Sequence, residues 1–154
     1  MKKSVKKLKL AQMSNKIRGL SKVAVQTPEK GWINAIRTTL GMSMSQLAIK
    51  TQKSHQAIHK LERSEAKGKI TLQSLREIAL ALDMKLVYGL IPIEEGSLED
   101  IIEKKAREMA IEIVKRTNRT MILEDQQVSD KRLKKEVQEL TKELVDEMPR
   151  NLWG

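Results

Sequence analysis

The sequence predicts an all-α, mainly helical protein, and three observations support this prediction. Apolar residues recur every three or four positions over most of the 154 residues, which is the spacing of one helix face. Serine or threonine precedes several of these apolar runs, as expected for helix N-caps. Aromatic residues make up only 2% of the chain and phenylalanine is absent. The apolar core must therefore consist mainly of Leu, Ile, Val, Met and Ala, and such a core forms most readily between packed helices.

Positive charge is concentrated in the first part of the chain. The net charge is +10, and residues 1–30 carry nine Lys or Arg against one acid, residues 31–96 nine against six, and residues 97–154 twelve against thirteen. This distribution suits a polyanion-binding module joined to a protein–protein module. Double-stranded DNA is one such polyanion and an acidic membrane surface is the alternative. The scarcity of aromatic rings argues against single-stranded nucleic acid, whose bases stack on rings.

The cysteine count and the hydropathy pattern indicate the cellular environment. The chain has no cysteine, so disulfides and thiolate zinc sites are excluded and a reducing cytoplasm is permitted. No apolar run approaches the ~18 residues of a membrane span. The N-terminal lysines are not followed by the continuous apolar stretch of a signal peptide. We therefore expect a cytoplasmic protein with no membrane contact.

Residues 1–30 are predicted to form a basic N-terminal helix and a linker. Val5, Leu8 and Ile17 lie near helical spacing among many lysines. The helix either docks on its own chain, with a solvated basic face, or reaches DNA as an arm. The stretch QTPEKG then forms a linker or turn.

Residues 31–83 are predicted to form a small domain of four short helices. The buried stripe of the first helix consists of Trp32, Ile33, Ile36 and Leu40. Ser43 and Gln46 have the spacing of a capping box at the start of the second helix. Ser54 caps the third helix, which runs to about Glu65, and Thr71 caps the fourth.

The second and third of these helices carry the functional signal. Their inward residues Leu47, Ala48, Ile58 and Leu61 fix how the two helices cross, and Ala48 is small where they come closest. Only about three residues separate the helices, and the outer face of the third is polar. This is the helix-turn-helix arrangement, in which the second helix of the pair lies in the major groove of DNA.

Residues 31–82 resemble the lambda-repressor-like, Cro/C1-type (XRE) helix-turn-helix family. The run LGMSMSQLAIKTQKSHQAIHKLER has that family's order of Leu-Gly, Ser cap, Leu-Ala, Ser cap, Ile and Glu. The chain also resembles the small bacterial family called mobile mystery protein A in the stretches GWINAIR, KLERSEAKGKITLQSLR, LVYGLIP and NLW. The first resemblance implies transcription regulation, and the second implies a companion protein with an AMP-transferring Fic domain. That companion would make this chain an antitoxin-like or autoregulatory member of the pair.

The resemblance places the base-reading positions on the third helix. They fall on His55, Gln56 and Lys60, with His59 flanking them. Gln56 is able to make a bidentate contact with adenine, and Lys60 to donate to guanine.

Phosphate contacts are expected around this helix. The expected residues are Ser43, Ser54, Lys53, Lys67 and Lys69. A solvated surface is the alternative role for the lysines. The family often has Gln where this chain has Met44, and Gly followed by an apolar residue where it has Gln52 and Lys53. Because a left-handed backbone disfavours glutamine, we expect a turn that differs from the family's.

The resemblance also implies an ion pair between Arg37 in the first helix and Glu62 in the third. The expected role of this pair is to orient the third helix, because the net stability contributed by a buried pair can be near zero. Two unrelated exposed charges are the alternative.

Residues 84–154 are predicted to form a strand and two amphipathic helices that serve dimerisation or partner binding. Residues 85–91 (KLVYGLI) are rich in β-branched and aromatic residues, so we expect a strand that pairs with a short piece of this chain or with a second copy. The two helices have more apolar surface than a small domain needs. A homodimer would then bind a palindromic operator, and packing back on the monomer is the alternative.

The sequence shows no sign of an enzyme, a cofactor or a metal site. His55 and His59 are the only histidines, and HQAIH has the spacing of the zinc-protease motif HEXXH. Gln56 stands where the general-base Glu is needed, and no third His or Cys completes a site.

The leading interpretation is a homodimeric repressor of transcription. The alternative is an interaction protein that neutralises a toxin partner through its C-terminal helices, with DNA binding secondary.

Overall fold

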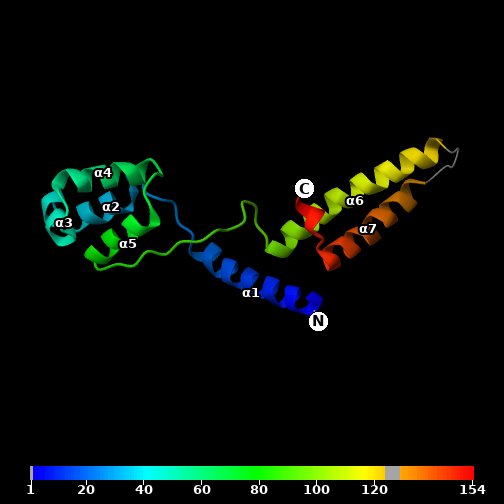
Figure 1. Ribbon diagram of the computed structural model, residues 1–154, viewed down its shortest axis with the longest axis horizontal. Helices are drawn as coiled ribbons and strands as arrows, with labels where there is room; N and C mark the ends of the chain where they lie inside the picture. Colours follow the sequence, from blue (N-terminus) through cyan, green and yellow to red (C-terminus); the bar gives the residue numbers. More distant parts are fainter. Residues whose placement is uncertain (1, 124–128) are drawn as a thin grey trace. The chain divides into compact units, whose positions relative to one another are not determined.

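The computed structural model describes residues 2–123 and 129–154, and these divide into two compact units. One unit consists of residues 24–89 (Figure 1). The other combines the N-terminal helix with residues 90–154. The predicted regions 1–30, 31–83 and 84–154 differ from one another in expected role rather than in compactness, and they stay a prediction.

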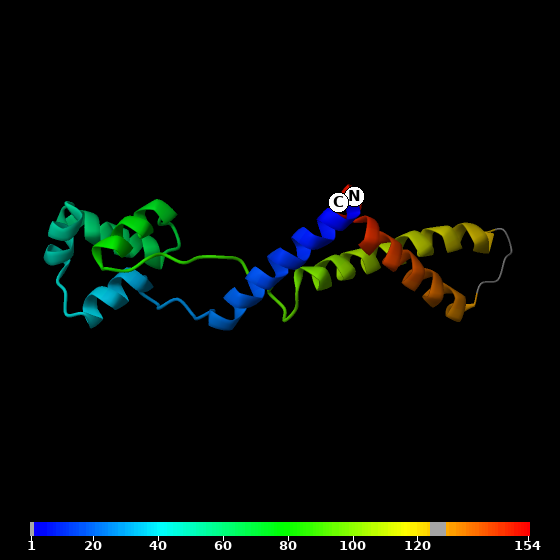
Figure 2. The same cartoon turned by 90° about the horizontal axis from the view of Figure 1, so that it is seen from below.

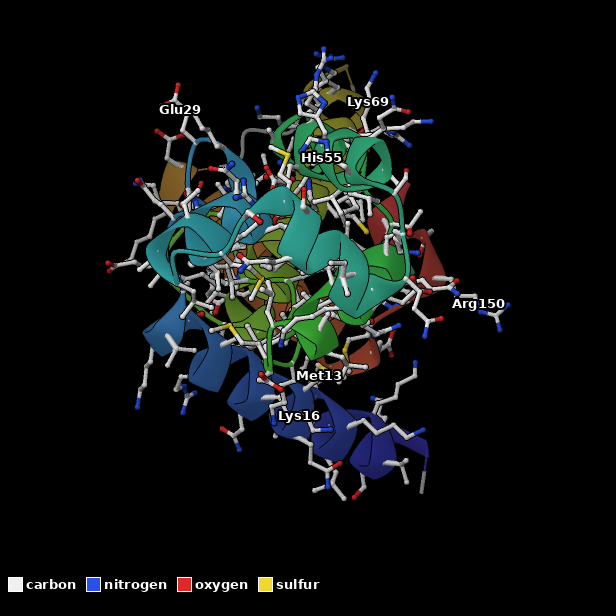
Figure 3. The ribbon with its side chains drawn as sticks, turned by 90° about the vertical axis from the view of Figure 1, so that its left-hand side faces the viewer. Met13, Lys16, Glu29, His55, Lys69 and Arg150 are labelled. Atoms are coloured by element: carbon white, nitrogen blue, oxygen red, sulfur yellow. The ribbon has the colours of Figure 1, made fainter. Side chains whose placement is uncertain are left out.

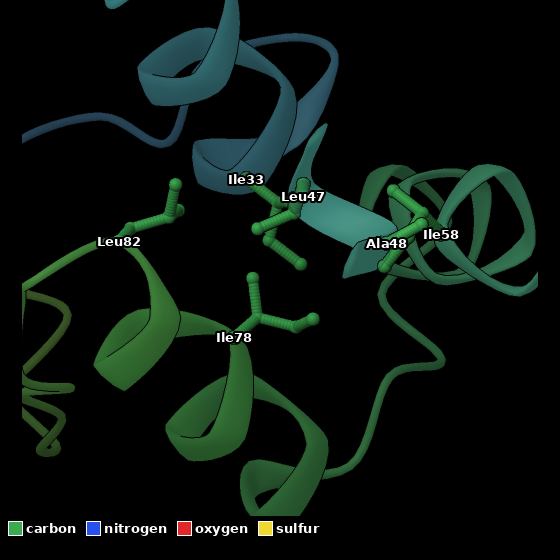
Figure 4. Packing of buried hydrophobic residues seen from close by; sticks show 6 residues of the cluster. All are labelled: Ile33, Leu47, Ala48, Ile58, Ile78 and Leu82. Carbon is green, nitrogen blue, oxygen red and sulfur yellow. The ribbon is translucent and has the colours of Figure 1, made fainter. Parts of the chain in front are cut away.

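The unit of residues 24–89 is a four-helix domain. Its helices are α2 (Gly31–Thr39), α3 (Met44–Thr51), α4 (His55–Ala66) and α5 (Leu72–Ala81). Each contributes to a single apolar core, which Figure 4 shows from close by and which consists of Ile33, Leu47, Ala48, Ile58, Ile78 and Leu82. Leu47, Ile58 and Ile78 have no exposed surface. The predicted inward face of the two central helices is therefore confirmed.

Three helix starts in this unit follow the predicted caps. The hydroxyl of Ser43 accepts from the backbone N–H of Gln46, and the Gln46 side chain accepts from the backbone N–H of Ser43, which completes the capping box. Ser54 and Thr71 cap α4 and α5 in the same way with their hydroxyls. These hydrogen bonds satisfy backbone donors that no helical carbonyl reaches.

The turn between α3 and α4 contains a left-handed residue that is not glycine. Gln52 has φ 55° and ψ 36° and ends α3, and the backbone N–H of Lys53 donates to the carbonyl of Ala48. The turn therefore keeps the left-handed geometry that glycine favours, so the expectation that glutamine would change this turn was wrong at position 52.

Two predictions in this part of the chain were wrong. Trp32 and Leu40 were placed in the buried stripe of the first helix, yet their side chains are 41% and 57% exposed. Residues 85–91 were predicted as a strand, but the described part of the chain contains no strand. The segment has the residue composition of a strand but forms none. No other segment of the described chain hydrogen-bonds to its backbone.

The other unit is also helical. It contains α1 (Lys2–Val23), α6 (Leu98–Leu123), α7 (Asp130–Glu147) and the short 3-10 helix η1 (Arg150–Trp153). The helices α6 and α7 form an antiparallel hairpin, seen from a second side in Figure 2. The core of the unit lies between these elements and consists of Ile102, Ala106, Ala110, Leu144 and Leu152. Since Ala106 and Ala110 are small and fully buried, α7 and η1 can approach α6 closely.

The basic helix α1 docks on α6 and α7. Its residue Leu10 packs against their core, the Ser14 hydroxyl donates to Glu99, and the Lys7 ammonium lies 2.7 Å from the Asp146 carboxylate. The hydrogen bond from Ser14 holds the pKa of Glu99 below its usual range. Docking on the same chain, one of the two roles left open for this helix, is therefore the observed arrangement.

Replacing Gln52 by glycine should stabilise the protein. A non-glycine residue in the left-handed region costs roughly 1–2 kcal/mol, and the added flexibility of glycine takes back about 0.5–1 kcal/mol. We expect Gln52→Gly to raise the free energy of unfolding by about 0.5–1 kcal/mol, measured by urea unfolding followed by circular dichroism. The control Lys50→Gly, inside α3, should lower it by a similar amount. Equal destabilisation by both variants would show that the turn is not under strain.

Candidate nucleic-acid interface

The helix α4 has one buried and one exposed face. Ile58 and Glu62 are buried, and Leu61 and Glu65 are half-buried beside them. The exposed side chains His55, Gln56, His59, Lys60 and Arg63 lie together within an arc of about 140° on the opposite side. The helix therefore presents mainly polar and basic groups to solvent, and Ala66 at its C-terminal end is the exposed apolar residue of this face.

A buried ion pair attaches this helix to α2. The Arg37 guanidinium approaches the Glu62 carboxylate with two nitrogens, Nε at 2.6 Å from Oε1 and Nη2 at 3.2 Å from Oε2. Arg37 and Glu62 are only 7% and 5% exposed. The remaining Arg37 nitrogen, Nη1, donates to the carbonyl of Met42 at 2.9 Å. The guanidinium thus connects α2, the α2–α3 loop and α4 in one network.

The Glu62 carboxylate is held in its charged form. Burial by itself raises the pKa of Glu62, but hydrogen bonds from Arg37 and Asn34 and the charges of Arg37 and His59 outweigh it. The pKa of Glu62 therefore lies below its ordinary value. Because the folded-state pKa is lowered, this contribution to stability is present at neutral pH and is lost as the pH falls through the lowered value.

A second carboxylate of α4 caps the beginning of α2. No side chain at the N-cap position of α2 does so, and instead Glu65 accepts from the backbone N–H groups of Trp32 and Ile33 at 2.8 and 2.9 Å. Gly31 makes this approach possible, because a Cβ at that position would lie 2.7 Å from the Glu65 carboxylate. Gly31 also has φ +84°, which other residues rarely adopt. Glu62 and Glu65 together fix α4 against α2.

The predicted base-reading residues all lie on the exposed face of α4. His55 and Gln56 belong to its first turn, and His59 and Lys60 follow one turn later. Figure 3 labels His55 on this helix and Lys69 in the loop that follows it. The predicted residues are thus brought together on one surface, and none of them forms an ion pair with a described residue.

The structure adds Arg63 to this surface. A hollow of about 270 Å³ is lined by His59, Lys60, Arg63, Ser64, Lys67 and Lys69. It joins two predicted base-reading positions to two predicted phosphate contacts. Sequence reasoning missed Arg63, although its spacing of seven from Gln56 and three from Lys60 places it on the same helix face.

The remaining phosphate candidates differ in their surroundings. The hydroxyls of Ser43 and Ser54 accept the capping hydrogen bonds of α3 and α4, so each stands at a helix N-terminus, where anions bind favourably. The Lys53 ammonium lies 3.3 Å from the Glu77 carboxylate of α5, an ion pair that a phosphate would have to compete with. The structure therefore gives Lys53 an intramolecular partner that the sequence did not reveal.

The described residues contain no group of three or more His, Cys, Asp or Glu side chains placed to hold a metal ion. Among the described helices, none combines the length and apolar character required to span a membrane.

The comparison with family models identifies the domain. Residues 33–88 match the family described as Helix-turn-helix. This unit is a helix-turn-helix domain of the XRE/Cro type. The chain therefore has the features of a DNA-binding helix-turn-helix regulator. No curated protein and no solved structure matches it, and the narrower resemblance to mobile mystery protein A is not confirmed.

Removing the Glu62 carboxylate should strongly destabilise the helix-turn-helix domain. Glu62→Ala leaves Arg37 buried without its counter-charge, which costs roughly 3–5 kcal/mol. The matched control Glu77→Ala breaks the exposed pair with Lys53 and should cost less than about 1 kcal/mol. Urea unfolding of the three proteins measures both effects. A Glu62→Ala variant as stable as Glu77→Ala would exclude the anchoring role of the pair.

Proposed function

We propose that this protein is a sequence-specific double-stranded-DNA-binding transcriptional regulator that represses its targets, its own gene included, as a homodimer. One observation supports the DNA-binding part above all others. The helix α4 is fixed to α2 by two carboxylates on its inner face, while the side chains on its outer face, apart from Ala66 at its end, are polar or basic groups. A rigid helix with such a face suits the major groove.

The chemistry of the exposed face separates base reading from phosphate binding. Gln56 projects from the first turn of α4, where a helix entering the groove comes nearest to the base edges, and its amide can pair with adenine. Lys60 lies one turn further along the same face. Lys67 and Lys69 stand at the end of α4 and in the loop after it, where phosphate contact is the natural role.

This division predicts different effects of two alanine substitutions. Gln56→Ala should cost about 1–3 kcal/mol of binding free energy on the cognate site and little on random DNA. Lys69→Ala should weaken both complexes by similar factors and reduce the salt dependence by roughly one unit of slope. Gel shifts at several salt concentrations, on DNA from upstream of the protein's own gene and on a scrambled duplex, measure both effects.

The control for this experiment is Gln73→Ala, an exposed glutamine of α5 outside the proposed surface. It should leave both affinities unchanged. If Gln56→Ala loses the same affinity on both duplexes, α4 does not read bases. The basic helix α1 would then be the next surface to test.

The homodimer is proposed to form through residues 84–154, with the apolar segment 84–93 at its centre. Val87, Leu90 and Ile93 are 65%, 88% and 105% exposed, an unusual exposure for such side chains. The backbone of this segment also lacks a strand partner in the described chain. Pairing with a second copy would cover both the side chains and the backbone groups.

Sedimentation velocity tests this dimer. The wild-type chain should sediment as a dimer at micromolar concentration, and Leu90→Lys should shift it to the monomer by placing a charge in the apolar contact. The control Ile49→Lys, at a residue that is 79% exposed but lies on α3, should remain dimeric. In a dimer on DNA, the two α4 helices should lie about 34 Å apart, one turn of the double helix. A monomeric wild-type protein would overturn the proposal.

The resemblance to mobile mystery protein A adds a Fic-domain protein as the expected companion. The stretches GWINAIR, KLERSEAKGKITLQSLR, LVYGLIP and NLW carry this resemblance. It makes the chain the antitoxin-like member of a pair, and co-purification of the two gene products tests it.

A further inference from the structure

A groove lies between α6 and α7, beside the core of their unit, and it shares no residue with the proposed DNA-binding surface. It has a volume of about 730 Å³ and is lined only by residues of these two helices. Ile111 and Val114 from α6 and Leu133 and Val137 from α7 form its apolar part. An apolar groove between two helices is the geometry that accepts the apolar face of a third helix.

The edges of this groove carry uncompensated positive charge. Arg107 and Lys115 of α6 and Lys134 and Lys142 of α7 line it, against the single acid Glu103. None of the four cations forms an ion pair with a described residue. The paired cations of the same two helices lie outside the groove and include Lys104, Lys105, Arg116, Arg132 and Lys135. The groove therefore gathers four cations without an ion pair beside one carboxylate.

A buried polar group in the groove lacks a partner. Asn118 lines the groove and is only 8% exposed, and its Oδ1 atom accepts no hydrogen bond from the described residues. Buried polar atoms are normally paired, because leaving one without a hydrogen bond destabilises the fold. The groove thus offers an acceptor that a bound molecule with an N–H or O–H donor would satisfy.

We propose that this groove binds an acidic amphipathic helix of a partner protein. The apolar side chains of that helix lie against Ile111, Val114 and Val137, its carboxylates face the four cations, and a polar side chain donates to Asn118. A second copy of this chain is disfavoured as the occupant, because a two-fold contact between grooves would bring the same cations together. The proposal is independent of the DNA-binding function, since the groove and α4 share no residue.

Binding of designed peptides to the full-length chain tests the proposal. Three fluorescent helical peptides share one apolar stripe and have acidic, neutral or basic polar faces. Fluorescence anisotropy should give the tightest binding for the acidic peptide and the weakest for the basic one. The affinity for the acidic peptide should fall as salt is added.

Charge-reversal variants show where the peptide binds. Lys134→Glu with Lys142→Glu should weaken binding of the acidic peptide roughly tenfold or more, because two attractive contacts become repulsive. The matched control, Lys131→Glu with Lys135→Glu, makes the same change of charge on α7 outside the groove and should have little effect. Neither variant should alter the gel shift on DNA, so failure of this proposal is distinguishable from failure of the proposed DNA binding.

The variant Asn118→Leu separates a binding role from a structural one. It removes a buried acceptor without a partner, so the Tm of the free chain should stay the same or rise. Binding of an acidic peptide that carries a serine or glutamine on its apolar edge should weaken about five- to tenfold. A lowered Tm with unchanged peptide binding would show that Asn118 is only structural.

Three results would overturn the proposal. The first is equal affinity for the acidic and basic peptides. The second is equal loss of binding in the groove variant and in its α7 control. The third is a loss of self-association in Lys134→Glu with Lys142→Glu, because this would identify a second copy as the occupant of the groove.

Discussion

The attachment of α4 to α2 is the interaction on which the DNA-binding unit depends. Two carboxylates one turn apart, Glu62 and Glu65, point from α4 toward α2. The first neutralises the buried Arg37 and the second replaces the missing N-cap of α2. Because a helix in the major groove must present its side chains at fixed positions, an attachment at two points along α4 is a requirement of base reading.

The two attachments have different energetic roles. The Arg37–Glu62 pair contributes little net stability compared with an apolar pair of the same shape, but breaking it leaves a buried charge. It therefore acts mainly as a constraint on geometry, which the third contact of Arg37 with the Met42 carbonyl extends to the loop before α3. Glu65 instead satisfies backbone donors that would otherwise lack partners at the start of α2, and it requires the glycine at position 31.

The second unit has no comparable buried ion pair among its described residues. There α6 and α7 bury an alanine-rich contact, and most ion pairs lie on the outer surface, where each contributes little. Against this background, the unpaired cations and the unsatisfied Asn118 of the α6–α7 groove stand out. A surface that carries both features is suited to recognition, because a partner gains the interactions that the free chain leaves unmade.

The sequence by itself determined the helices, their caps and the inner face of the helix-turn-helix. Ser43, Ser54 and Thr71 act locally on backbone groups three residues away, and Leu47 and Ile58 follow the helical period, so both signals are contained in short stretches of chain. The tertiary structure decided the rest. The cap that Glu65 supplies to α2, the pairing of Lys53 with Glu77 and the docking of α1 on α6 join residues distant in sequence, which no local pattern encodes. The expected strand at 85–91 failed for the same reason, since β-branched composition gives a tendency, whereas a strand exists only where another segment pairs with its backbone.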